Sequence, residues 1–92
     1  MKKCLKIVLT GNFAPTFLRT TLLKHARACV LEGVARLVRN DQMAIMVCGD
    51  KEQVEQFLDG LYENDTEWNI TTIEVEPFVK DKDYRGIFRI IE

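Results

Sequence analysis

The spacing of apolar residues along this chain switches between a period of two and a period of three to four. Leu5, Ile7 and Leu9 point to one face while Lys6 and Thr10 point to the other, which predicts a half-buried strand over about positions 4–10. From about Pro15 the apolar residues recur at helical spacing, at Leu18, Leu22, Ala26 and Cys29 or Val30. This pattern predicts a helix with one buried face, and Pro15 suits its first turn because an N–H there has no helical partner.

The same switch occurs a second time. We expect Gly33 to close the first helix and residues 34–39 and 42–48 to form two strands. A tight turn at Asn40–Asp41 joins them, because Asn and Asp tolerate the left-handed backbone of hairpin turns. The second of these strands is apolar on both faces, which predicts a central position in the sheet. A second helix follows, with Asp50 as N-cap, Gln53 as capping-box partner, and apolar spacing at Val54, Phe57, Leu58 and Leu61.

The last third of the chain predicts two more strands. Ile73 and Val75 alternate with polar residues and Pro77 ends the run, while a charged loop, "KDKDYRG", precedes a final strand in "IFRII". The order β-α-β-β-α-β-β fits a ferredoxin-like, split β-α-β sandwich of the α+β class. We expect an antiparallel sheet of four to five strands, with two helices on one face, in a single domain over residues 1–92.

Composition narrows the function classes. The net charge is −1 and the isoelectric point about 5.8, without the basic stripe of a nucleic-acid-binding protein. Apolar runs such as 43–47 are far shorter than the ~20 residues of a membrane span. The first residues resemble a signal peptide, but Lys6 interrupts a short apolar stretch that lacks a cleavage site. We therefore expect a cytoplasmic protein that binds neither nucleic acid nor membrane.

The cysteines and the histidine give no sign of a metal site. Cys4, Cys29 and Cys48 are far apart and follow no metal-ligand spacing. We expect three buried, reduced thiols. His25 is the only histidine and lies at the border of the first helix's apolar stripe, so we expect a structural rather than a catalytic role.

Several local motifs lie at the spacing of a known family. They are "GNFAPTFLR" at 11–19, Gly33 with Val34, the "ND" turn, "CGD" at 48–50, "VEQFLDGL" at 54–61 and the final "FRII". Together they resemble the acylphosphatase family, whose loop after the first strand reads G-x-V-Q-G-V-[GF]-F-R and whose next strand carries G-x-V-x-N. The alignment needs no gap between Gly11 and Leu61.

The resemblance implies a chemistry. Acylphosphatases are small cytosolic proteins that hydrolyse the carboxyl–phosphate bond of acyl phosphates without metal or cofactor. Backbone N–H groups of the loop cradle the phosphate oxygens, and the arginine, here Arg19, adds a bidentate charge-assisted contact. An asparagine holds the attacking water in line. Most of such catalysis is positioning and electrostatics.

This chain departs from that pattern at the positions that matter most. The cradle loop consists of Gly11, Asn12, Phe13, Ala14, Pro15, Thr16, Phe17 and Leu18. Pro15 replaces a glycine, so an N–H is missing and φ is fixed near −65°. Ala14 replaces the glutamine. The ungapped position of the catalytic asparagine is Leu37, and Asn40 could replace it only after a register shift that would turn a buried strand face outward.

Three functions stay open on these residues. The first is an acylphosphatase-like domain that has lost most or all hydrolysis and serves as a binding module for a small anion or a protein partner. Phe13, Pro15 and Phe17 would then form an apolar rim over the cradle or fill it. The second is a working acylphosphatase that uses Arg19 for the phosphate and Asn40 for the water. The third is a small-molecule regulatory module of the same broad fold.

Overall fold

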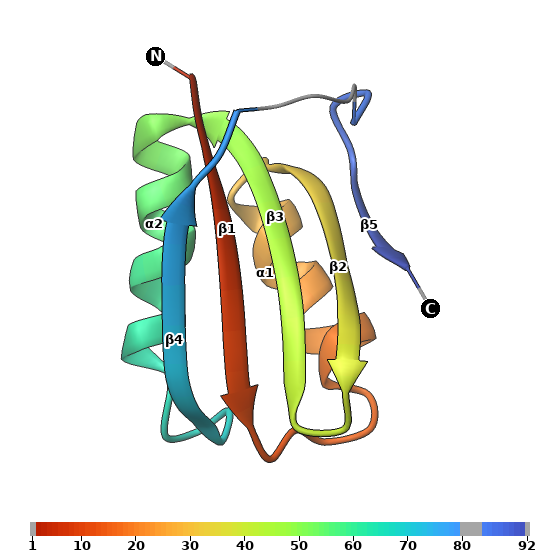
Figure 1. Ribbon diagram of the computed structural model, residues 1–92. Helices are drawn as coiled ribbons and strands as arrows, with labels where there is room; N and C mark the ends of the chain where they lie inside the picture. The colour runs from red at the N-terminus through yellow and green to blue at the C-terminus, as the bar shows by residue number, and fades with distance from the viewer. Residues whose placement is uncertain (1, 80–83, 92) are drawn as a thin grey trace.

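The computed structural model describes residues 2–79 and 84–91. Most of the charged loop, residues 80–83, lies outside the described residues. Five strands and two helical segments follow in the predicted order, and the first helical segment consists of η1 followed directly by α1 (Figure 1). They are β1 (Lys2–Gly11), η1 (Leu18–Leu22), α1 (Leu23–Ala28), β2 (Glu32–Arg39), β3 (Gln42–Asp50), α2 (Lys51–Glu63), β4 (Ile70–Pro77) and β5 (Phe88–Ile91).

The five strands form one sheet in the order β4-β1-β3-β2-β5, with both helices on the same face (Figure 1). β3 is central, as its apolar sequence predicted. The expected all-antiparallel sheet is wrong in one place, because β5 pairs with β2 in parallel. The reason lies in the strand order: β4 and β5 occupy opposite edges of the sheet, so these two consecutive strands do not form a hairpin (Figure 1).

The core lies between the sheet and the helices. Alternate residues of β1 and β3 point toward the helices and are buried, as the period of two predicts. α2 packs its buried stripe on this layer through Val54, Phe57 and Leu61. The first helical segment adds Leu22 and Ala26, both fully buried. Ile7, Leu9, Ile45 and Val47 close the centre of the core.

The first helix differs from the prediction at both ends. It starts at Leu18, with a π-helical turn before the α-helical part, so Pro15 precedes the helix instead of lying in its first turn. It ends at Ala28, and Gly33 lies in β2 with φ +145°. A side chain at Gly33 would collide with the backbone carbonyl of Met46 on β3. The glycine therefore permits close strand pairing and does not end the helix.

The β2–β3 hairpin turns at Asn40 and Asp41, as predicted. The predicted left-handed backbone is wrong: among the described non-glycine residues, positive φ occurs at Val30, Asn69 and Arg85 and at neither turn residue. The strand register shifts between Leu37 and Arg39. Such a bulge increases the local twist, so the turn does not need left-handed residues to match the twist of the strands.

Asp50 is the N-cap residue of α2, as predicted, but its side chain makes no capping hydrogen bond. Its carboxylate instead lies 3.7 Å from the ammonium group of Lys2. The capping-box prediction is therefore right about where the helix begins and wrong about the bond.

His25 joins the two helices. Its Nε2 donates a hydrogen bond to the carbonyl of Phe57 at 2.9 Å, and its ring stacks on the Phe57 ring at 4.8 Å. The ring also lies where a Cβ at Gly60 would be. The histidine thus has the structural role that its border position predicted, and a glycine in the middle of α2 is required by this close approach.

We expect Gly60→Ala to destabilise the protein by about 1–3 kcal/mol because the added methyl collides with the anchored His25 ring. The measurement is urea denaturation. In a His25→Ala background the same change should stabilise by up to about 1 kcal/mol, since alanine is the better helix former. Equal effects in both backgrounds would contradict the contact.

A disulfide links two of the three cysteines. Cys4 and Cys48 are directly opposite on β1 and β3, with Cα atoms 4.2 Å apart, and are bonded to each other. The expectation of three reduced thiols is therefore wrong for this pair, because strand pairing brings together residues 44 positions apart. Cys29 is free and buried, and burial raises the pKa of its thiol. The cytoplasmic location stays a prediction.

In denaturant without reductant, titration should find one thiol per chain, that of Cys29, and three after reduction. A Cys29→Ser variant should show none before reduction and two after it. Replacing both Cys4 and Cys48 by serine should lower the free energy of unfolding by about 2–4 kcal/mol, because the crosslink restricts the unfolded chain. Three thiols without reductant would contradict the pairing.

No helix among the described residues is both long enough and apolar enough to span a bilayer.

Candidate functional site

The cradle loop leaves β1 at Gly11 and enters η1 at Leu18. Gly11 donates its backbone N–H to the carbonyl of Asp41 at 2.9 Å. A side chain at this position would collide with the carbonyl of Asn69. The retained glycine therefore has a structural explanation in the close approach of the chain that enters β4.

Several backbone donors of the loop are used within the protein. Asn12 donates its N–H to the carbonyl of Asn69 at 2.9 Å, and Phe17 donates to that of Ala14 at 3.0 Å. Gly11 donates to Asp41, and Pro15 has no N–H. Four of the eight positions from 11 to 18 therefore offer no hydrogen to an anion in this conformation.

Phe17 anchors the loop to the core. Its side chain is 5% exposed, stacks on Phe13 at 5.3 Å and meets Trp68 edge-on at 5.7 Å. Pro15, in contrast, is exposed. Phe17 therefore packs into the hydrophobic core, where Trp68 contacts it, and whether the loop's apolar residues form a rim or fill the cradle stays a prediction.

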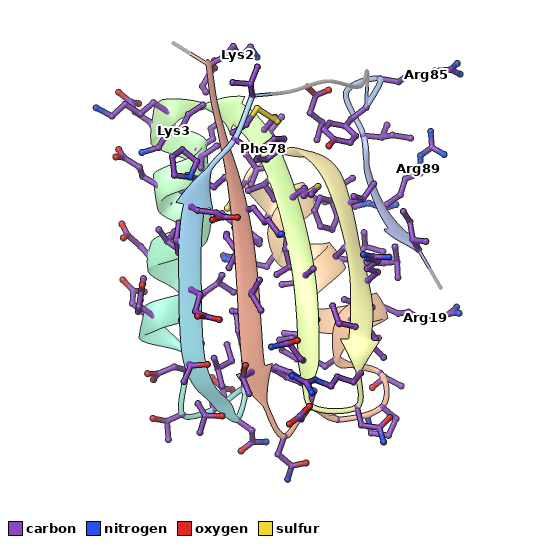
Figure 2. All side chains as sticks on the ribbon, viewed as in Figure 1. Lys2, Lys3, Arg19, Phe78, Arg85 and Arg89 are labelled. Carbon is purple, nitrogen blue, oxygen red and sulfur yellow. A yellow bond between two sulfur atoms is a disulfide. The ribbon has the colours of Figure 1, made fainter. Side chains whose placement is uncertain are left out.

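Arg19 is exposed on η1 and extends away from the sheet (Figure 2). It lines a groove of about 720 Å³ between the first helical segment and β5, whose walls include Leu23, Arg27 and Arg89. None of the residues from 11 to 18 lines this groove. The groove therefore lies beside Arg19 and is not formed by the cradle loop.

The two positions that could correspond to the family's water-holding asparagine are both exposed. Leu37 lies on β2 opposite Met43, with 53% of its surface exposed, and its hydrocarbon side chain can neither donate nor accept a hydrogen bond. Asn40 lies in the hairpin turn. Neither residue lines the groove that Arg19 borders. The described residues that line this groove therefore include no amide side chain that could hold a water beside Arg19.

A shallow hollow of about 430 Å³ lies beside the start of the loop. Gly11 and Asn12 line it, together with Asp41 and Asp65. The negative charges of these two aspartates would repel a phosphate bound in the hollow. The hollow is therefore unsuited to an acyl phosphate.

Sequence reasoning missed Arg27 and Arg89 as neighbours of Arg19. The spacing Arg19–Leu23–Arg27 was visible, since residues four apart share one helix face. Arg89 could not be placed beside them, because nothing in the sequence predicted that β5 pairs with β2 in parallel.

The fold and the strand–loop–helix segment together define a small ferredoxin-like α+β domain with an arginine just beyond its first loop. A family model described as Acylphosphatase matches residues 5–90. The chain belongs to the acylphosphatase family.

Solved structures agree with this assignment at the level of the fold. An acylphosphatase from Bacillus subtilis matches with a TM-score of 0.83 and 16% identity, over 100% of both chains. One from Coxiella burnetii matches with 0.82 and 18%, over 98% of this chain and 93% of that one. T. kodakarensis HypF gives 0.78 and 21%, over 100% of this chain but 12% of its own. A search of curated proteins found no significant match.

Because Phe17 is packed in the core, we expect Phe17→Ala to cost about 3–5 kcal/mol of stability. Phe13→Ala, at a half-buried neighbouring position on the same loop, serves as the matched control and should cost clearly less. Urea denaturation measures both. Similar losses in the two variants would contradict the anchoring role of Phe17.

Proposed function

We propose that this protein is an acylphosphatase-family domain that has lost most or all acyl-phosphate hydrolysis and serves as a binding module. The proposal rests on the hydrogen bonds that the backbone N–H groups of the cradle loop already make within the protein. Gly11, Asn12 and Phe17 direct their N–H groups to protein carbonyls, and Pro15 has none. A cradle that stabilises a developing phosphoryl charge needs such groups preorganised and aimed at the anion.

Leu37 supports the same conclusion. An in-line attack needs a group that holds the water, and the aligned side chain offers no hydrogen bond. Removing one preorganised donor typically lowers kcat by about 10²–10³. With four of the eight loop positions offering no N–H and the water-holding amide missing, little of the family's rate enhancement remains available to this chain.

A working acylphosphatase is the second candidate. Arg19 favours it, because the arginine is retained at its family position and is exposed beside a groove. Asn40 is exposed in the β2–β3 hairpin turn. In this alternative, Arg19 would hold the phosphate and Asn40 the water.

Hydrolysis of benzoyl phosphate separates the two functions. We expect the wild-type protein and Arg19→Ala to hydrolyse it at the same rate, indistinguishable from buffer. The double variant Pro15→Gly with Leu37→Asn should raise turnover by at least about 10²-fold, because it restores an N–H and an amide. Wild-type turnover that disappears in Arg19→Ala would refute the loss of activity.

Two control variants identify which missing group matters. Pro15→Ala restores the N–H without the freedom of glycine at positive φ, and Leu37→Ala removes the apolar side chain without adding an amide. Neither should reproduce the gain of the double variant. Circular dichroism should show the same fold in all of them.

A further inference from the structure

The groove between the first helical segment and β5 has the size of a small-molecule site. Its volume of about 720 Å³ falls within the roughly 300–1,000 Å³ of typical ligand pockets. Leu23 lines it from α1, and Phe88 and Ile90 line it from β5. These side chains give the middle of the groove an apolar surface.

Among the described residues that line the groove, every charged side chain is an arginine. Arg19, Arg27 and Arg89 line it, and no acidic residue of the described chain does. Arg27 and Arg89 form no ion pair within residues 2–79 and 84–91. Glu32, which lies close to the groove wall, accepts a hydrogen bond from the N–H of Gly86 at 2.8 Å. Figure 2 shows Arg19 and Arg89 on the same side of the molecule.

The helix arranges the cationic and apolar groups in sequence. Arg19, Leu23 and Arg27 are four residues apart, so they follow one helix face with leucine between the two arginines. Arginine forms strong, bidentate bonds with carboxylates and phosphates. The face therefore suits a ligand that combines a negative head with an apolar body.

Val30 gives an independent sign that the groove has a use. It follows α1 with φ +56° and is 70% exposed. Its N–H bonds to Arg27 and that of Leu31 to Ala26, the pattern of a Schellman helix end, where glycine is the favoured residue. A left-handed backbone is unfavourable for a β-branched residue. The turn itself does not explain the valine, but its side chain lines the groove.

We propose that this groove binds a small amphiphilic anion, with a carboxylate or phosphate head held by the arginines and an apolar body along Leu23, Val30 and Ile90. This inference deepens the proposed binding function and names its ligand class. It concerns a surface that the residues from 11 to 18 do not line.

Titration with octyl phosphate and octanoate, followed by NMR of the labelled protein, tests the proposal. Both should shift signals of residues 23–31 and 86–90, whereas octanol and inorganic phosphate should bind at least about tenfold more weakly. Arg27→Gln should weaken octyl phosphate binding about tenfold, the effect of one charge-assisted contact. Arg36→Gln is the matched control, because Arg36 is an exposed arginine on β2 that does not line the groove.

Val30→Gly separates ligand binding from stability. It should raise Tm by about 3 °C, because glycine removes the left-handed strain, yet weaken octyl phosphate binding several-fold. The proposal would be overturned if Arg27→Gln and Arg36→Gln weakened octyl phosphate binding equally, or if octanol bound as tightly as octyl phosphate. It would also be overturned if the protein bound poly-glutamate, an acidic polymer, but did not bind octyl phosphate. Benzoyl phosphate turnover would refute the loss of hydrolysis and leave the groove standing. Unchanged binding in Arg27→Gln would refute the groove alone.

Discussion

The antiparallel pairing of β1 with β3 fixes the place of everything else in this protein. The register sets Leu5 beside Val47, Ile7 beside Ile45 and Leu9 beside Met43, all buried against the helices. A slip of one residue would turn the buried set of the shifted strand toward solvent. The cradle loop starts where β1 ends, α2 starts where β3 ends, β4 pairs with β1, and β2 pairs with β3. Hydrophobic burial on one face thus determines where the loop and the groove lie.

Most of the fold could be predicted because burial leaves a periodic trace in the sequence. Strands at 4–10 and 43–48 and the stripe from Val54 to Leu61 were read from that trace and confirmed. What failed depends on atoms far apart along the chain. Gly33 was predicted to end the first helix, but it is required by the close approach of the Met46 carbonyl on the neighbouring strand. The pairing of Cys4 with Cys48 follows only from strand register.

The candidate site was less predictable than the fold. The sequence identified the loop, its proline and the leucine at the asparagine position, all of which are matters of residue identity. It could not give the direction of each N–H group or the packing of Phe17 in the core. Nor could it show that Arg19 shares a groove with Arg27 and Arg89, since that depends on the parallel attachment of β5. Features of the site that depend on residue type could be predicted from the sequence, and features that depend on the spatial arrangement of residues could not.

The bond between Cys4 and Cys48 encloses a definite part of the molecule. Residues 5–47 form a closed covalent ring that contains the cradle loop, the first helix and all of β2, whereas α2, β4 and β5 lie outside it. A protease that cut the exposed chain near Pro15 would open the ring without separating the two pieces. The loop therefore belongs to the one region of the protein where a broken backbone does not release a fragment.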